Sequence, residues 1–158
     1  MATNLHEIAI AAPPARVFAA LTDAAEIRQW WTDDARAEAV AGSVAEFGFF
    51  DRRVVFRMRI DALTAPATLR WACIGGPEQW VGTALAFDVA PAERGGTTLR
   101  FKHSGWRSRD GHFPTSNTTW GHLLHRLRAY AEGRSPGPYF RGGGVDGQGA
   151  PAGARSPT

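Results

Sequence analysis

The sequence lacks the features that mark several large classes of protein. It holds one cysteine, Cys73, so an intramolecular disulfide is excluded and a reducing compartment is indicated. No apolar run is long enough to cross a bilayer, and no charged segment followed by an apolar core opens the chain. We therefore expect a cytoplasmic protein that does not insert into membranes.

Signatures of nucleic-acid binding and of common enzyme sites are missing as well. The 18 basic residues are scattered among 15 acidic ones, and no run of lysine or arginine forms a basic stripe. A glycine-rich phosphate loop, a nucleophile elbow and a clustered pair of carboxylates are all absent. We expect neither a nucleic-acid partner nor a cofactor.

What is present is typical of one globular domain followed by a tail. The 158 residues are 44% hydrophobic and 21% charged, and they contain no internal repeat. Residues 1–140 carry the apolar mass. Residues 141–158 are rich in glycine, proline, alanine and serine, which bury too little to offset the entropy of ordering, so this tail is predicted to be disordered.

The longest helical pattern runs from Ser116 to Gly133. Its apolar residues recur at helical spacing on one stripe: Trp120, Leu123, Leu124, Leu127, Tyr130 and Ala131. The segment Pro114–Ser116 supplies a breaker and a capping oxygen before it, and Gly133 suits the left-handed turn that ends a helix. Gly121 costs about 1 kcal/mol relative to alanine inside a helix, which predicts a close approach to another backbone.

The N-terminal third reads as one strand and two short helices. Leu5–Ile10 alternates weakly and ends at Pro13 and Pro14. The second proline fits the first turn of a helix, Pro14–Thr22. Asp23 and Glu26 resemble a capping box for a second helix, Ala24–Trp31.

The middle of the chain alternates between apolar and polar residues, as antiparallel strands do. The pattern is clearest from Arg53 to Asp61. Turn residues separate the predicted strands, which are Leu5–Ile10, Ala35–Val40, Val44–Phe50, Arg53–Asp61, Thr68–Ile74, Trp80–Val89 and Thr97–His103. Ser104–Thr115 is predicted to be a loop. The order predicts an α+β fold in which a curved antiparallel sheet of about six to seven strands wraps around the long C-terminal helix.

This order of elements resembles the SRPBCC, or START-like helix-grip, superfamily. Within it, the branch related to the activator of the ninety-kilodalton heat-shock protein's ATPase is the most similar. The resemblance covers Leu5 to about Gly133. It is carried by Pro13–Phe18, Leu21, Thr22, Asp23, Trp30, Trp31, Gly42, Trp120, Gly121, Leu123, Leu124, Leu127, Tyr130 and Gly133.

The resemblance implies a cavity between the sheet and the long helix that often holds an apolar small molecule. Its lining is expected to come from inward strand residues and the first helical turns. The candidates for ligand binding are Phe56, Met58, Trp71, Cys73, Thr83, Leu85, Phe101, His103, Ser116, Asn117 and Trp120.

Several of these residues allow two interpretations. His103 lies on an apolar face, where it is either a hydrogen-bonded core histidine or a general acid or base. Trp30 and Trp31 either fill and cover the core or gate the cavity mouth. Trp106, in the predicted loop, either packs simply or contacts a partner or the cavity. An apolar strand raises the pKa of Cys73, so we expect a core residue there.

Two groups of polar side chains also allow either a structural or a functional interpretation. His122 and His125 are three residues apart on a helix, with His112 nearby, but no carboxylate or cysteine joins them at ligand spacing, so we expect no metal site. The second group consists of Arg52, Arg53, Arg57, Arg59, Arg100 and Lys102. It forms either the solvated side of a sheet or a basic face for an acidic partner.

Three functions follow from the residues and the resemblance. The first is a binding module for a small hydrophobic or aromatic, including lipid-like, molecule, with no reaction assigned. The second is an enzyme similar to polyketide cyclases or aromatases, with His103 handling protons and Asn117, Thr83 or Tyr130 assisting. The third is a protein that modulates a chaperone ATPase, although those co-chaperones carry a further N-terminal domain. A homodimer and other protein partners stay open.

Overall fold

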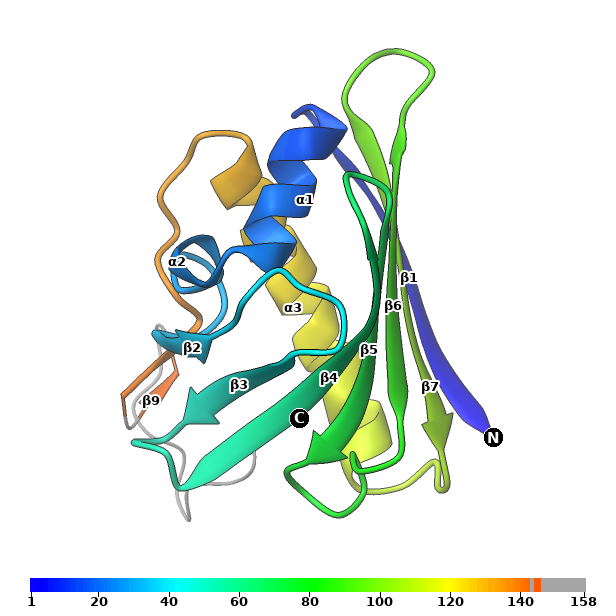
Figure 1. The fold of residues 1–158 in the computed structure, drawn as a ribbon, viewed down its shortest axis with the longest axis vertical. Helices are drawn as coiled ribbons and strands as arrows, with labels where there is room; N and C mark the ends of the chain where they lie inside the picture. Colours follow the sequence, from blue (N-terminus) through cyan, green and yellow to red (C-terminus); the bar gives the residue numbers. More distant parts are fainter. Residues whose placement is uncertain (143, 146–158) are drawn as a thin grey trace.

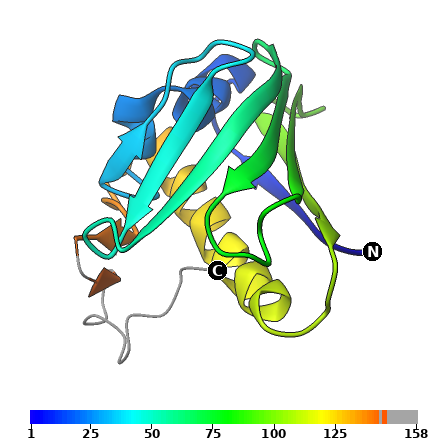
Figure 2. The same cartoon turned by 60° about the horizontal axis from the view of Figure 1, so that its bottom comes forward.

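The long C-terminal helix crosses the concave face of a curved, seven-stranded antiparallel sheet (Figure 1). The structure is a computed structural model, and it describes residues 1–142, 144 and 145. The strands lie in the order β1-β7-β6-β5-β4-β3-β2. Figure 2 shows the strands arching over α3, with the N-terminal strand at one edge of the sheet. This is the predicted α+β helix-grip fold.

The strands follow the alternation of the sequence closely, because each buries one face and exposes the other. Their bounds are β1 Ala2–Ile10, β2 Asp34–Arg36, β3 Val44–Phe49, β4 Val54–Thr64, β5 Thr68–Gly75, β6 Ala84–Pro91 and β7 Thr97–Trp106. In β4, Phe56, Met58 and Ile60 are buried as predicted. The register of β4 and β5 slips between Ile60 and Ala62, which is a β-bulge that bends the sheet.

The helices are α1 (Pro14–Thr22), α2 (Ala24–Ile27) and α3 (His112–Ala131). α1 begins at Pro14 as predicted, because a proline in the first turn removes an N–H that has no partner there. It packs against α2, α3 and β6. The Asp23 side chain caps α2 by accepting from the Ala25 N–H at 2.8 Å. Glu26 instead pairs with Arg16 and accepts from the Tyr130 hydroxyl, so no capping box forms.

Several predicted boundaries were wrong. α2 ends at Ile27 rather than Trp31, and β2 ends at Arg36 rather than Val40. The strand predicted from Trp80 starts at Ala84, because residues 80–82 form a turn that buries Trp80 and exposes Val81. β7 continues to Trp106, which shortens the predicted loop.

The start of α3 and the role of Gly121 were also predicted wrongly. Helix α3 begins at His112, and Pro114 lies within its first turn, where a proline is tolerated. A Cβ atom at Gly121 would have no neighbour within 4 Å, so no backbone approaches it closely. Gly133, at φ +93°, closes the helix as predicted, with its N–H bonded to the Tyr130 carbonyl.

After α3 the chain runs back beside α2 and β2 (Figure 1), where Phe140 forms a parallel bridge with Thr32. Phe140–Arg141 (β8) and Gly144–Val145 (β9) form a two-stranded ladder. The rest of the predicted tail, residue 143 and residues 146–158, lies outside the described residues. No helix in the described part of the chain is long and apolar enough to span a membrane.

Candidate functional site

The predicted lining residues meet in the space between the sheet and α3. All but one of them are buried there: Phe56, Met58, Trp71, Cys73, Thr83, Leu85, Phe101, His103, Ser116 and Trp120. Asn117 is exposed instead. It lies beside the edge strand, where its side-chain oxygen accepts from the Asn4 amide at 3.2 Å. The buried residues therefore form one apolar interior, and Asn117 marks its rim.

Aromatic rings fill most of this interior. Trp31 stacks on Phe47 with ring centroids 4.5 Å apart, and Trp120 lies 4.4 Å from Phe101. Both Trp30 and Trp31 are buried, and the Trp30 indole donates to the Ala20 carbonyl at 2.9 Å. Trp106 is buried as well, 4.5 Å from the His103 ring. Trp30, Trp31 and Trp106 thus pack in the core together with Trp120.

One small space, partly open to solvent and called the internal space below, remains among these rings. Its volume is about 10 Å³, which is room for about one water molecule. It is lined by Trp31, Phe49, Phe56, Trp80, Thr119, Trp120, Leu123 and Phe140. Of these residues, the predicted lining included Phe56 and Trp120, and Trp31 was predicted to fill the core or gate the cavity mouth. The prediction missed Phe49, Trp80, Thr119, Leu123 and Phe140. The position of Trp80 depends on a turn, and Phe140 comes from the segment after α3, so alternation gave no signal for either.

A chain of hydrogen bonds fixes His103 in this interior. The Trp120 indole N–H donates to its Nδ1 at 3.2 Å, so Nδ1 is the unprotonated nitrogen. Its Nε2–H therefore donates to the Thr83 hydroxyl at 2.8 Å. That hydroxyl donates in turn to the Trp80 carbonyl at 2.6 Å. Both ring nitrogens are occupied, and the imidazole is held as one neutral tautomer.

Burial makes His103 hard to protonate. Desolvation lowers its pKa from 6.5 to about 3, because the charged imidazolium would lose its water and gain no carboxylate partner. A general base at neutral pH needs a pKa near the working pH and a reachable proton. The structure favours a structural histidine over a proton-transfer group.

Other buried polar atoms are left without partners. The indole N–H groups of Trp71, Trp80 and Trp106 and the Ser116 hydroxyl are buried and have no hydrogen-bond partner among the described residues. Leaving a buried donor unpaired costs about 1–3 kcal/mol, so most native donors find an acceptor, a water or a ligand. Of these four residues, Trp80 lines the internal space.

Cys73 and the surface histidines show no reactive environment. Burial raises the pKa of the Cys73 thiol to about 11, which keeps it protonated at neutral pH. His122 stacks on Tyr139, and His125 Nδ1 lies 3.0 Å from an Arg128 nitrogen. Within the described residues, no three His, Cys, Asp or Glu side chains are grouped so that they could hold a metal ion.

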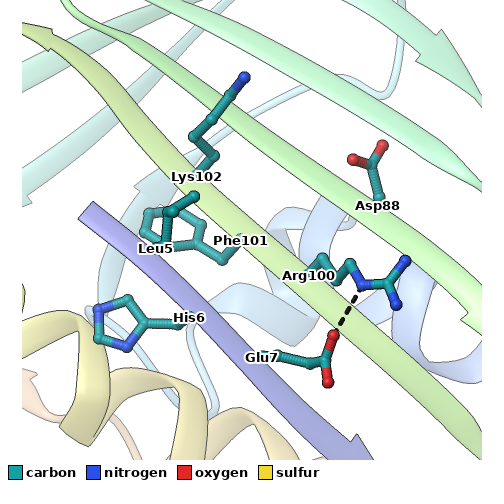
Figure 3. A pocket seen from close by; sticks show the side chains of 7 residues that line it. All are labelled: Leu5, His6, Glu7, Asp88, Arg100, Phe101 and Lys102. Carbon is teal, nitrogen blue, oxygen red and sulfur yellow. Dashed lines mark hydrogen bonds and ion pairs between the residues drawn. The ribbon is translucent and has the colours of Figure 1, made fainter. Parts of the chain in front are cut away.

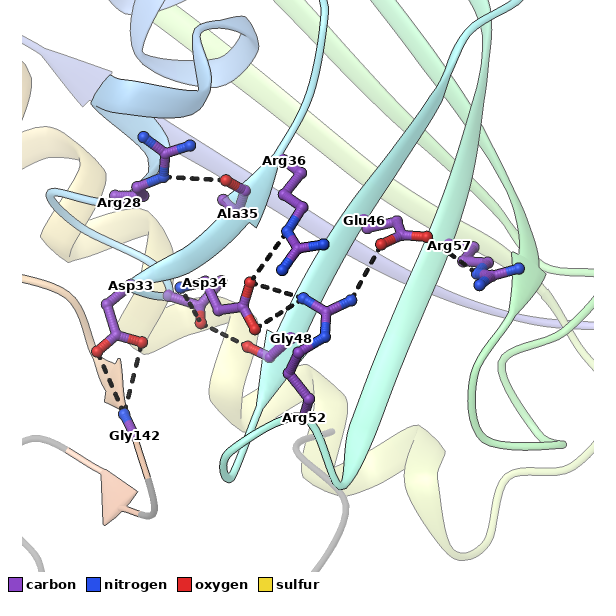
Figure 4. Close-up of polar contacts among 11 residues, drawn as sticks. Arg28, Asp33, Asp34, Ala35, Arg36, Glu46, Gly48, Arg52, Arg57 and Gly142 are labelled. Atoms are coloured by element: carbon purple, nitrogen blue, oxygen red, sulfur yellow. Dashed lines mark hydrogen bonds and ion pairs between the residues drawn. The ribbon is translucent and has the colours of Figure 1, made fainter.

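Acids pair with Arg52, in the turn between β3 and β4, and with the arginines of β4 (Figure 4). Arg52 donates to both oxygens of Asp34, at 2.7 and 2.8 Å, and to Glu46 at 3.0 Å. Arg57 pairs with Glu46, and Arg59 pairs with Asp61. This is a network of partly exposed ion pairs, each worth little alone, rather than an unopposed basic face.

A second, open depression lies on the outer face of the sheet beside β1 (Figure 3). It has a volume of about 430 Å³ and is lined by Leu5, His6, Glu7, Asp88, Arg100, Phe101 and Lys102. Glu7 pairs with Arg100 at 2.7 Å, and Leu5 is 71% exposed. The His6 ring turns toward α3, where burial lowers its pKa.

Comparisons with known proteins agree with this architecture. The Aha1 dimer from Colwellia psychrerythraea, solved in solution, is 31% identical, has a TM-score of 0.76, and the match covers 84% of this chain and 97% of that chain. Protein MLL2253 from Mesorhizobium loti is 21% identical, with a TM-score of 0.70 over 80% of this chain and 94% of that one. DynU16, from the dynemicin biosynthetic locus, is 24% identical, with a TM-score of 0.72 over 88% of this chain and 50% of that one.

The last two likenesses establish the fold alone, and no protein with a curated description matches. The family evidence is stronger. Residues 11–132, from the end of β1 to the end of α3, match the family described as Activator of Hsp90 ATPase homolog 1-like protein. With the 31% identical relative and the helix-grip fold, this shows that the chain is an SRPBCC domain and belongs to the Activator of Hsp90 ATPase homolog 1-like family.

Proposed function

We propose that this domain is a binding module for a small, uncharged aromatic molecule held between the sheet and α3. The observation that carries the proposal is that Trp80, whose buried indole N–H has no partner among the described residues, lines a space whose other walls are apolar side chains and Thr119. Such a combination of aromatic walls and a few unsatisfied polar groups is typical of small-molecule sites. The ligand oxygen that accepts this hydrogen bond would remove a cost of about 1–3 kcal/mol.

The internal space is too small for an aromatic ligand unless its walls move. About 10 Å³ does not admit an aromatic ring, so part of the wall has to move when the ligand enters. The walls contain no acidic or basic side chain, and a charged ligand would lose its hydration without gaining a counter-ion. These two points support an uncharged ligand and binding coupled to a conformational change.

The environment of His103 supports a binding role over a cyclase-like reaction. Its ring nitrogens are both bonded within the core, and its low pKa keeps it neutral. His103 does not itself line the internal space, and none of the residues that line it is an acid or a base. We therefore assign no reaction to the site.

The test uses Thr119, which lines the space from α3 and is half-buried. Thr119→Phe should fill the space and weaken binding of aryl ketones about tenfold or more, measured by titration calorimetry. Thr118→Phe places the same ring at the neighbouring exposed position and should bind as the wild type does. Equal affinity for both variants would refute the site, as would a wild-type protein that binds no uncharged aryl compound.

A second candidate function is self-association. The relative from Colwellia psychrerythraea is described as a dimer, and β1 of this chain is an edge strand with Leu5 exposed at its middle. Exposed edge strands of this kind pair readily with another chain. The depression around Leu5 holds two acids and two bases, Glu7, Asp88, Arg100 and Lys102, so two copies would not repel each other there.

A further inference from the structure

The segment after α3 closes over the internal space. We call residues 138–142 the C-terminal strap. The Phe140 N–H donates to the Trp31 carbonyl at 2.8 Å, and the Asp33 N–H donates to the Phe140 carbonyl at 3.2 Å. At its far end, the Gly142 carbonyl accepts from the Asp51 N–H at 3.1 Å. The strap therefore bridges the segment after α2 and the turn between β3 and β4.

Phe140 is the apolar anchor of this strap. Its side chain is 4% exposed and meets Phe49 edge-to-face, with ring centroids 4.9 Å apart. It also meets Phe50 at 6.1 Å and lines the internal space. The other lining residues all belong to the range 11–132 that matches the family, whereas Phe140 lies beyond it. The residues of the family-matched range thus form most of the lining, and the segment after that range adds the Phe140 ring to it.

The turn that receives the strap is strained. Phe50, Asp51 and Arg52 all have positive φ angles, of 53°, 56° and 62°, which side-chain-bearing residues adopt at a cost of about 1–2 kcal/mol each. This backbone buries Phe50 beside Phe140 and turns the Asp51 N–H toward the strap. Strain of this kind gathers at functional sites, where the surrounding structure holds it in place.

The linker before the strap is held to α3, and a glycine lies between the two. Arg126 on α3 holds the preceding linker by donating to the Pro136 and Gly137 carbonyls, both at 2.6 Å. Gly137, at φ +72°, then forms a glycine hinge directly before Pro138. Besides Phe140, Tyr139 contacts the body of the domain: its ring stacks on His122 with centroids 6.0 Å apart, and its N–H donates to the Trp30 carbonyl at 3.3 Å. A short segment held by these few contacts belongs to the low-stability end of local unfolding.

From these contacts, and on the basis of the function proposed above, we infer that Phe140 occupies the ligand's place. An aromatic ring enters the space by displacing Phe140 and the strap about the Gly137 hinge. The ring that fits is the size of a phenyl group, uncharged, and carries an acceptor oxygen for the Trp80 indole N–H. The strap lowers the apparent affinity, because only the fraction of molecules with the strap released can bind.

The experiment combines two probes with two variants. Acetophenone has a phenyl ring and an acceptor oxygen, and ethylbenzene has nearly the same shape without the oxygen. Phe140→Ala should bind acetophenone about tenfold or more tightly than the wild type, since no ring has to be displaced. Phe18→Ala removes an equally large buried ring from α1, outside this space, and should bind as the wild type does. Ethylbenzene should bind more weakly than acetophenone.

Hydrogen exchange of the wild type tests the inference even if Phe140→Ala fails to fold. Acetophenone should speed exchange of the Phe140 and Asp33 amides and slow exchange in α3. Protection of the strap that rises or stays unchanged on binding would overturn the displacement, and so would equal affinity of the wild type and Phe140→Ala. In both cases the binding function would stand. If neither protein bound acetophenone, the proposed function and the displacement would fall together.

Discussion

At the scale of single residues, His103 has the environment with the clearest consequence. It is buried among Trp80, Trp106 and Trp120, and its hydrogen bonds suit only the neutral ring. The folded pKa of about 3 lies below the ordinary value of 6.5. Between these values the unfolded chain binds a proton at this position that the folded chain does not.

The stability of the protein should therefore fall as the pH drops below about 6.5. The contribution is fully present above that value and is lost at about 1.4 kcal/mol per pH unit down to a pH of about 3. Between about pH 7.5 and about pH 5, we expect the wild type to lose about 2 kcal/mol more than His103→Gln, measured by urea unfolding. Other groups titrate in both proteins, so the difference isolates His103. Parallel pH profiles would mean that His103 is accessible to protons in the folded state.

Alternation placed His103 correctly on the buried face of β7, but its partners could not be predicted from the sequence. Thr83 precedes β6 in a turn, and Trp120 belongs to α3, so the three meet only through the tertiary fold. For Asn117, in contrast, the predicted position inside the cavity was wrong. It follows the buried Ser116 in α3, and the helical turn of about 100° per residue carries its side chain to the exposed rim.

At the scale of elements, α3 carries a glycine that nothing in the described structure requires. Gly121 lies in the middle of the helix, and an added Cβ would meet no atom within 4 Å. Its φ angle is not positive, so alanine fits the backbone. Glycine at such a position costs about 1 kcal/mol relative to alanine.

Gly121→Ala should accordingly stabilise the protein by about 0.5–1 kcal/mol in urea or thermal unfolding. Gly133→Ala, just after the end of the same helix, is the matched control. Its φ of +93° disfavours any side chain, so that variant should be destabilised by about 1 kcal/mol or more. A destabilised Gly121→Ala would indicate that another chain or molecule packs closely against this turn of α3.

The element boundaries show where periodicity stops being informative. Pro114 looks like a barrier before a helix, yet it fits the first turn of α3, where its missing N–H has no partner to lose. Trp80 and Thr83 extend the alternation of β6, yet residues 80–82 turn so that Trp80 packs against Phe56 with ring centroids 4.4 Å apart. In both places tertiary packing decided between two local patterns that the sequence allows equally.

At the scale of the whole molecule, the order of elements sufficed to predict the fold. One strand, two short helices, a run of alternating strands and a long amphipathic helix have few compact arrangements, and this chain adopts the helix-grip one. The size of the space between the sheet and α3, in contrast, could not be predicted from the order of elements. It depends on how Trp31, Trp80 and Phe140 pack together, and Phe140 reaches this site from beyond the family's matched range.

The self-association proposed above concerns the whole molecule, and the observations that support it lie at the β1 edge of the sheet. β1 forms one edge and exposes Leu5 beside the charge-balanced depression. A register shift between Ala2 and Asn4 disturbs the first residues of that edge, so regular pairing with another copy would use the part of the strand from Leu5 onward.

If β1 pairs between two copies, the protein should sediment as a dimer at concentrations of about 10–100 µM, and Leu5→Lys should shift it to the monomer by placing two like charges near the two-fold axis. Val40→Lys supplies the control, since Val40 is also exposed, at 56%, but lies in the loop between β2 and β3 at the opposite edge. It should leave the dimer intact. A wild type that stays monomeric throughout would exclude self-association at these concentrations. A dimer that survives Leu5→Lys would exclude β1 as its interface, and dissociation by Val40→Lys alone would move the interface to the β2 edge.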